Sequence, residues 1–215
     1  AGAGRIINLS SAGAFGEAAF RHDILREETH ADPVSLYSMT KFASERTASR
    51  MADVWGIDAL SVRLSGVFGR WERRTSVRDT PSPQYQLCAA VRAGRPARIP
   101  RRDHRDWIYA PDVASAVLAL IDAPRLNHRL YNVSTGERWA VFDWAEAFAL
   151  HWPSFDISLT EPGERADIDF HAATDRGMLS IERLVADTGF KPAFDRDASA
   201  ADYADWARGD GAGYG

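Results

Sequence analysis

The sequence contains one cysteine and very little lysine. Because Cys88 is alone among 215 residues, the chain cannot form an internal disulfide or a zinc site made of several cysteines. No run approaches the roughly 18 consecutive apolar residues that a membrane-spanning helix requires. The six histidines lack the His-x-x-x-His and His-x-Glu spacings of metal ligands, so we expect no metal site. A lone cysteine and the lack of a membrane segment predict a cytoplasmic protein without membrane contact.

Arginine supplies nearly all of the positive charge. Of 26 basic residues only Lys41 and Lys191 are lysine, while the net charge is -4 and 45% of the residues are hydrophobic. These values are typical of a folded globular domain with a sizeable core. A basic stretch runs from Arg92 to Arg105, but two prolines interrupt it and the chain is acidic overall. We therefore expect no nucleic-acid partner.

The order of the predicted elements indicates the fold class. Residues 5–9 are typical of a buried strand, residues 36–55 have helical spacing and end before Gly56, and residues 59–64 form the next strand. Strand, helix and strand in this order favour a parallel sheet with a crossover helix. The prediction is an α/β fold, a doubly wound, Rossmann-like parallel sheet seen without its first strands, with a small C-terminal α/β lobe.

Further elements are predicted along the rest of the chain. Asp112 is expected to cap an amphipathic helix that stops before Pro124. Gly189 is expected to end a helix over residues 178–188. The remaining predictions are helices over residues 84–93, 141–152 and 198–208, and strands over residues 130–133 and 156–160.

Tyr37 and Lys41 are the first candidates for chemistry. Residues four apart on a helix share one face, so the phenol and the ammonium can approach the same point. A nearby cation favours the phenolate, the form that accepts a proton from a substrate hydroxyl. The alternative is an ordinary surface pair that supports the helix.

Two serines follow the first strand. Ser10 and Ser11 stand where the carboxyl end of a parallel strand opens on the ligand crevice. A hydroxyl at this place can donate a hydrogen bond to a developing alkoxide or to a carbonyl oxygen. The alternative is a local bond to the main chain, which is the commoner role of serine at a strand end.

Five blocks of sequence together carry a family resemblance. They are Ser10-Ser11-Ala12-x-x-Phe15-Gly16, Tyr37-x-x-x-Lys41, Val62-Arg63-Leu64-x-x-Val67-Phe68-Gly69, Arg105-Asp106-Trp107-Ile108-Tyr109-x-x-Asp112 and Tyr131-Asn132-Val133-x-x-Gly136. In this order the blocks resemble the extended short-chain dehydrogenase/reductase family, the NAD-dependent epimerase/dehydratase group that acts mostly on nucleotide sugars. The resemblance covers residues 5 to about 206.

The resemblance implies a catalytic role for three residues. Ser11, rather than Ser10, corresponds to the family's catalytic serine, because it stands five residues before the glycine of the first block. Tyr37 corresponds to the general acid/base, and Lys41 to the lysine that also holds the nicotinamide ribose. A small-molecule substrate and a homodimer through helix 36–55 are implied as well.

The resemblance also implies binding residues. The cofactor, NAD or NADP, would contact Tyr37 and Lys41 together with Gly66 and Val67. The substrate would contact Ser11, Arg70 and Arg105. Arg105, in the Arg-Asp-aromatic block, corresponds to an arginine that often reaches the substrate diphosphate. The family often has asparagine at the place of Gly66 and proline at the place of Arg70. An arginine-rich loop over residues 70–78 is suited to an anionic group.

The family's glycine-rich first turn has no counterpart in this sequence. Family members begin with a strand, a Gly-x-x-Gly-x-x-Gly turn and a helix that binds the pyrophosphate. We expect residues 1–69 to be the C-terminal half of a Rossmann-like catalytic domain. Residues 70–215 are expected to be mainly a substrate-binding lobe, with short segments returning to the sheet.

Two functions follow from these observations. The first is an NAD(P)-dependent oxidoreductase or epimerase/dehydratase that acts on a sugar-like or nucleotide-sugar hydroxyl or carbonyl group through Ser11, Tyr37 and Lys41. The alternative is a catalytically silent relative without a cofactor, which serves as a binding or interaction module. The lack of the glycine-rich turn favours the alternative, and the presence of all three site residues favours the enzyme.

Overall fold

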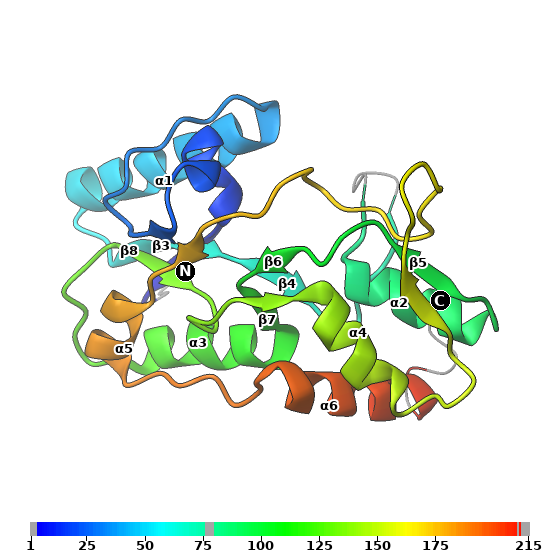
Figure 1. The fold of residues 1–215 in the computed structure, drawn as a ribbon. Coiled ribbons are helices and arrows are strands. Elements are labelled where there is room, and N and C mark those ends of the chain that lie inside the picture. Colours follow the sequence, from blue (N-terminus) through cyan, green and yellow to red (C-terminus); the bar gives the residue numbers. More distant parts are fainter. Residues whose placement is uncertain (1–3, 76–79, 210, 212–215) are drawn as a thin grey trace. The chain divides into compact units, whose positions relative to one another are not determined.

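The computed structural model describes residues 4–75, 80–209 and 211, which form two compact units (Figure 1). The first unit comprises Ala1–Gly66, Asp106–Glu137 and Arg176–Pro192. The second comprises Val67–Arg105, Arg138–Asp175 and Ala193–Gly215. Each unit draws on three separate stretches of the chain and is described by itself.

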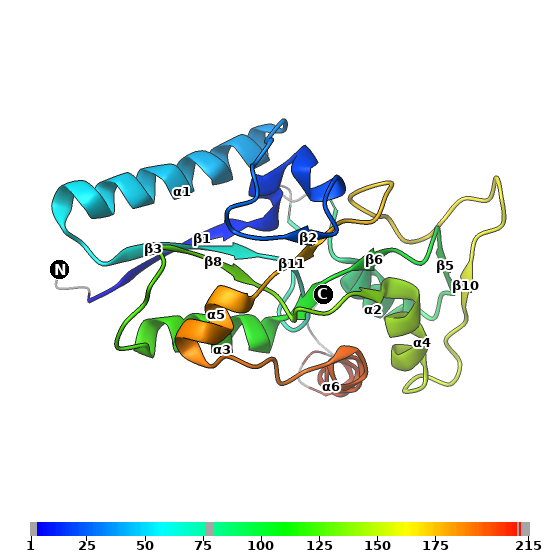
Figure 2. The same cartoon turned by 60° about the vertical axis from the view of Figure 1, so that its left-hand side comes forward.

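The first unit is built on a parallel sheet. Its strands are β1 (Ile6–Ser11), β3 (Ala59–Leu64) and β8 (Leu130–Val133), in the spatial order β1-β3-β8. Helix α1 (Leu36–Trp55) covers one face, and α3 (Ala110–Asp122) and α5 (Glu182–Thr188) lie on the other (Figure 2). The predicted α/β fold with parallel strands is confirmed.

Helix α1 begins and ends where the sequence predicts. Ser35 and Ser38 form a reciprocal capping box at its start, and Gly56 adopts the left-handed conformation, with φ 63°, at its end. Ser38, Glu45 and Ala52 are buried on the face that meets the sheet. Helix α1 is thus held at both ends by local interactions and along one side by packing.

The predicted helix over residues 178–188 is wrong in its first turn. Met178–Leu179 form strand β11, which pairs in parallel with β2 (Ile24–Leu25). Ser180 donates its main-chain N–H to the oxygen of Leu25 at 2.9 Å. Only α5 remains helical, because a partner more than 150 residues away takes the hydrogen bonds of the first turn. Before β2, the chain forms the 3-10 helices η1 (Ala12–Phe15) and η2 (Glu17–Phe20).

Asp112 does not cap α3, which corrects a second prediction. Tyr109, the last residue of β7 (Trp107–Tyr109), is the N-cap, and no side chain caps the helix. Pro111 is favourable in the first turn because it lacks an N–H that would need a partner. Asp112 therefore lies within the first turn of the helix, where it is buried.

Over its described residues, the second unit has two small sheets and three helices. Strand β5 (Ala97–Ile99) pairs in parallel with β10 (Ile157–Leu159), and β6 (His104–Arg105) pairs antiparallel with β9 (Trp139–Ala140). The helices are α2 (Pro83–Arg92), α4 (Val141–Ala149) and α6 (Arg196–Arg208). Strand β4 (Gly66–Phe68) follows β3 along the chain. Helix α4 is three residues shorter than predicted, and α6 begins two residues earlier, after Asp195 as its cap.

Aromatic side chains form the core of the second unit. Trp144 stacks on Phe148 with ring centroids 5.0 Å apart, and Tyr203 of α6 lies 6.1 Å from both rings. Trp144 also donates a hydrogen bond to Ser199 at 3.1 Å. These contacts join α4 to α6. In neither unit is there, among the described residues, a helix with the length and apolar character needed to cross a bilayer.

Candidate active site

Strand β1 runs two residues further than predicted, to Ser11, where η1 begins. Ser11 is the N-cap of η1, and its hydroxyl accepts a hydrogen bond from the N–H of Gly13 at 3.0 Å. The local bond to the main chain that the sequence left open is therefore present. A serine hydroxyl that accepts one bond still has its own proton to donate, so Ser11 can serve a ligand at the same time.

Tyr37 and Lys41 lie on α1 beside the end of β1. The Tyr37 side chain is 56% exposed, and none of the residues that the structure describes bonds to its hydroxyl. The Lys41 Nζ lies 5.8 Å from the centroid of the Tyr37 ring. Lys41 also donates a hydrogen bond to the main-chain oxygen of Leu9 at 2.9 Å. The phenol and the ammonium thus share one face of α1.

Gly13 shows that Ser11 belongs to the same cluster. A Cβ placed on Gly13 would lie 3.0 Å from Cε1 of Tyr37 and 3.3 Å from the Ser11 hydroxyl oxygen. The Tyr37 ring and the Ser11 hydroxyl therefore flank this glycine closely, and a larger residue would require them to shift. The structure brings Ser11, Tyr37 and Lys41 together at the carboxyl end of β1.

These residues fit the sugar end of a nicotinamide nucleotide. An ammonium carries three donor protons, and the bond to Leu9 uses one of them, so Lys41 has donors left for the hydroxyls of a ribose. The Tyr37 hydroxyl can both donate and accept a hydrogen bond, and its residue is exposed. The donors are those that a polyhydroxylated ligand needs.

Gly66 has a structural explanation of its own. A Cβ at this position would lie 2.5 Å from Cε3 of Trp107, whose indole is buried against the glycine. An asparagine, which the family often has here, would overlap the indole. The absence of a side chain at Gly66 is thus explained by Trp107.

Three predicted binding residues, Val67, Arg70 and Arg105, belong to the second unit. Val67 is half-buried. Arg70 forms a two-pronged ion pair with Asp202, in which Nε donates to Oδ2 at 3.1 Å. Arg105 is buried, and its Nη2 lies 3.5 Å from Oδ1 of Asp103. Residues 76–78 of the predicted arginine-rich loop lie outside the described residues.

Sequence reasoning missed a buried charged group in the first unit, beside Ser11 and Lys41. Ser10 donates a hydrogen bond to Glu45 at 2.5 Å, and Arg63 of β3 donates to both carboxylate oxygens of Glu45. Glu45 stands four residues after Lys41, on the same face of α1. This spacing was the available signal, but an acidic residue on a helix is most often exposed to solvent.

Asp106 is the centre of a second buried network in the first unit. Its Oδ1 accepts from Ser65 at 2.8 Å and from Arg176 at 2.5 Å, and its Oδ2 accepts from Ser134 at 2.8 Å. The N–H of Leu179 also donates to Oδ2, at 2.8 Å. These four hydrogen bonds give Asp106 a structural role in the first unit.

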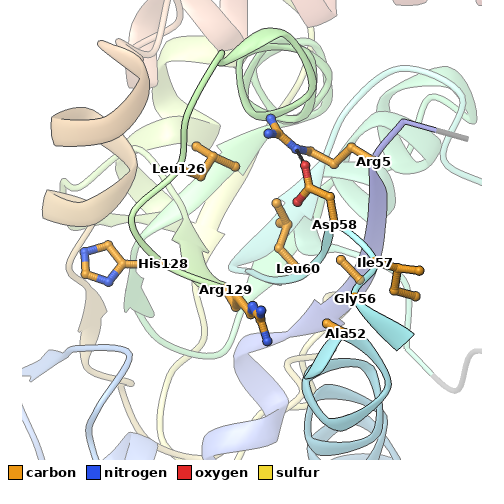
Figure 3. A pocket seen from close by; sticks show the side chains of 10 residues that line it. Arg5, Ala52, Gly56, Ile57, Asp58, Leu60, Leu126, His128 and Arg129 are labelled. Atoms are coloured by element: carbon orange, nitrogen blue, oxygen red, sulfur yellow. Dashed lines mark hydrogen bonds and ion pairs between the residues drawn. The ribbon is translucent and has the colours of Figure 1, made fainter. Parts of the chain in front are cut away.

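A pocket of about 440 Å³ lies at the opposite edge of the sheet (Figure 3). Its lining includes Arg5, Asp58 and Arg129, which immediately precede β1, β3 and β8 in that order. Leu60 and other residues complete it. Figure 3 shows Arg5 paired with Asp58, at 2.8 Å. Because parallel strands have all their carboxyl ends at one edge, this pocket is separate from Ser11. No group of three or more possible metal ligands occurs among the described residues of the chain.

Comparison with known proteins identifies the family. A model of the NAD dependent epimerase/dehydratase family matches residues 1–134. The chain belongs to this family. The resemblance seen in the sequence is confirmed, and with it the prediction of an enzyme family that uses a nicotinamide cofactor.

Individual relatives are distant. The dTDP-L-rhamnose 4-epimerase of Burkholderia thailandensis is 21% identical over 180 residues, which are 84% of this chain and 48% of that protein. The structure of L-threonine dehydrogenase from Phytophthora infestans has a TM-score of 0.78 and 21% identity, covering 96% of this chain and 66% of that one. The UDP-glucuronic acid 4-epimerase from Bacillus cereus, solved in complex with NAD, has a TM-score of 0.75 and 15% identity, covering 95% and 61%. The chain spans about half the length of the curated relatives that it matches.

Proposed function

We propose that the chain supplies the catalytic site of an NAD(P)-dependent oxidoreductase or epimerase/dehydratase. Its substrate is a hydroxyl or carbonyl group of a sugar-like molecule or a nucleotide sugar. The observation that carries this proposal is the cluster of Ser11, Tyr37 and Lys41 at the carboxyl end of β1. The family match supports it, as do the names of the sugar-nucleotide epimerases among the relatives.

Each of the three residues has a distinct task. Tyr37 takes the proton from a substrate hydroxyl, or returns it to a carbonyl oxygen, through its exposed phenol. Lys41 stabilises the phenolate that this transfer requires, since its ammonium lies on the same helix face. Ser11 donates a hydrogen bond to the reacting oxygen and so stabilises the charge that develops there. A nicotinamide held by Lys41 and Tyr37 would supply the acceptor or donor of the hydride.

Binding of the cofactor and binding of the substrate's anionic part are assigned to different residues. Lys41 and Tyr37 hold the nicotinamide ribose through their free donors, and the main chain at Gly66 and Val67 contacts the cofactor. Arg70 and Arg105 bind the anionic part of the substrate, because a guanidinium matches phosphate or carboxylate oxygens in two-pronged geometry. Both arginines already have a carboxylate neighbour, Asp202 and Asp103, which orients them.

The same proposal includes a homodimer and a cytoplasmic location. On α1, the face opposite Glu45 is exposed along its whole length and carries Leu36, Met39, Ala43, Thr47, Arg50 and Val54. Leu36 and Val54 are 18 residues apart, which is five helical turns, so they lie in line. An exposed stripe of this kind is suited to packing against the same helix of a second copy. The single thiol, on Cys88, is buried and unpaired, which suits a reducing compartment.

Replacing Tyr37 by phenylalanine tests the catalytic assignment. In the complete protein we expect Tyr37→Phe to lower kcat by about 10² to 10⁴-fold, because the proton-transfer group is lost. Tyr85→Phe, which removes a hydroxyl in the second unit, is the control and keeps wild-type turnover. Full activity of Tyr37→Phe on an identified substrate contradicts the proposal. Failure of the wild-type protein to bind NAD(H) or NADP(H) in a titration favours the silent interaction module instead.

A further inference from the structure

The ion pair between Glu45 and Arg63 is buried in the first unit. The two side chains are 4% and 3% exposed. Arg63 donates from Nε to Oε1 of Glu45 at 2.9 Å and from Nη2 to Oε2 at 2.7 Å, which is a two-pronged contact. Neither side chain is accessible to a substrate from the solvent. A charge pair so completely removed from water contributes little net stability by itself, so its position calls for another explanation.

Two further contacts connect the pair to the catalytic cluster. Ser10, the residue before Ser11, donates a hydrogen bond to Oε1 of Glu45 at 2.5 Å. The guanidinium of Arg63 lies over the ring of Phe15 in η1, with Cζ 4.2 Å from the ring centroid. Ser10 and Arg63 also face each other in the register of β1 and β3. The pair therefore touches the segments on both sides of Ser11.

Helix α1 and the end of β1 are joined by a continuous seam of hydrogen bonds. Three successive residues of β1 each bond to α1, namely Asn8 to Ser44 at 3.2 Å, Leu9 to Lys41 at 2.9 Å and Ser10 to Glu45 at 2.5 Å. The distance between Ser11 on the strand and Lys41 on the helix is thus controlled by bonds that lie directly beside them. Of these three bonds, only the one to Glu45 involves a carboxylate that forms a buried ion pair, with Arg63.

We propose that Glu45 is a positioning residue for the Ser11–Tyr37–Lys41 site. Together with Arg63 and Ser10, it holds α1 against the end of β1, so that the phenol and the ammonium stand at a fixed distance from the serine hydroxyl. The proposal rests on the function proposed above. It assigns the buried pair to the geometry of the site, because catalytic groups must be held within a fraction of an ångström by their supporting residues.

The scarcity of lysine allows a direct test of this positioning. The chain has two lysines, and Lys191 is exposed in the first unit. Reductive methylation followed by mass spectrometry therefore measures the reactivity of Lys41 against Lys191 in the same molecule. In Ser10→Ala and in Glu45→Gln, we expect Lys41 to react about threefold faster relative to Lys191, because its bond to Leu9 is loosened. An unchanged ratio in both folded variants overturns the proposal.

A double replacement separates positioning from folding. Glu45→Gln leaves the Arg63 charge buried and can destabilise the chain, whereas Glu45→Met combined with Arg63→Met replaces the pair by apolar groups and is expected to fold. If the pair only stabilises the fold, this double variant keeps the wild-type labelling ratio. If the proposal is right, its Lys41 is as reactive as in Glu45→Gln. Tyr131→Phe, which removes a buried hydroxyl elsewhere in the unit, is the control and leaves the ratio unchanged.

Kinetics on the complete protein give the second readout. In the double variant we expect kcat to fall by about 10²-fold with KM within about twofold of wild type, because binding groups remain but the reacting groups are misaligned. A wild-type kcat in this variant overturns the proposal. Should Tyr37→Phe prove fully active, the catalytic assignment fails, while the labelling ratio still decides whether Glu45 positions Lys41.

Discussion

The ammonium of Lys41 donates a hydrogen bond to the main-chain oxygen of Leu9 at 2.9 Å. A lysine side chain has a flexible four-carbon stem, and an exposed one samples many rotamers. Here the bond fixes the charge at the end of β1, two residues before Ser11 and within 5.8 Å of the Tyr37 ring centroid. The position of the cation is therefore set by the sheet as well as by the helix that carries it.

Gly13 sets the distance between Ser11 and Tyr37. In Gly13→Ala the new methyl group would lie 3.0 Å from Cε1 of Tyr37, so the ring must move by a few tenths of an ångström. We expect kcat to fall about tenfold because the phenol is displaced, with the free energy of unfolding changed by less than about 1 kcal/mol. Gly4→Ala is the matched control, since nothing lies within 4 Å of a Cβ there. Steady-state kinetics and urea unfolding measure both quantities, and equal kcat values in the two variants would show that the site tolerates the methyl group.

Asp106 is expected to be the most sensitive polar residue of the first unit. Asp106→Asn leaves the buried Arg176 without its charge partner and replaces an acceptor oxygen by a donor. We expect a loss of about 3–5 kcal/mol in the free energy of unfolding, measured by urea denaturation. Glu28→Gln, which breaks an exposed ion pair with Arg183, should cost less than about 1 kcal/mol. Similar losses in the two variants would contradict the assignment.

Tyr131 and Asp187 predict how stability depends on pH. Tyr131 donates to Oδ2 of Asp187 at 2.6 Å, and burial together with this bond raises the pKa of the Tyr131 phenol. The unfolded tyrosine loses its proton near pH 10. Above about pH 10 the unfolded chain therefore releases a proton that the folded chain keeps, and stability falls as the pH rises.

At acid pH the dependence has the opposite sign, because the free energy of unfolding falls as the pH is lowered. Burial raises the pKa of Asp187, but the hydrogen bonds from Tyr131 and Asn127 outweigh it, so the net shift of the pKa is downward. This contribution is present above the unfolded value of 3.8 and is lost as the pH falls below it. In Tyr131→Phe both limbs should flatten in urea unfolding between pH 3 and 11. If the free energy of unfolding of this variant falls above pH 10 as steeply as that of the wild type, groups other than Tyr131 cause the fall.

The exposed stripe of α1 predicts the assembly. Val54→Asp places a charge on the stripe, which should shift the protein from dimer to monomer in light scattering after size-exclusion chromatography. Leu118→Asp changes a side chain of equal exposure, 57%, on α3 of the same unit and should leave the dimer intact. A monomeric wild-type protein, or a Val54→Asp variant that remains dimeric, would show that the stripe is not a dimer interface.

Elements with strong local signals could be predicted from the sequence. Helix α1 was predicted with both ends in place, because Gly56 stops it and its apolar spacing is regular. Strand β3 has the predicted bounds, because six residues with the pattern of a buried strand stand between loop residues. The pairing of Tyr37 with Lys41 follows from helical spacing alone, and the structure places them together.

Long-range contacts account for what was missed. Met178–Leu179 and Ile24–Leu25 are each too short to signal a strand, and each is a strand only because the other is its partner. Glu45 has the sequence pattern of a solvent-exposed helix residue, and its burial depends on Arg63, 18 residues further along the chain. Asp112 has the residue type of a helix cap, but Pro111 allows the helix to begin one turn earlier.

The aromatic core of the second unit has a spectroscopic consequence. Five of the seven tryptophans belong to that unit, namely Trp71, Trp139, Trp144, Trp152 and Trp206, and only Trp55 and Trp107 belong to the first. Tryptophan emission therefore reports mainly on the unit that contains α4 and α6. Helical circular dichroism draws on both units, since α1 is the longest helix described. The two signals coincide during unfolding only if the units melt as one cooperative body.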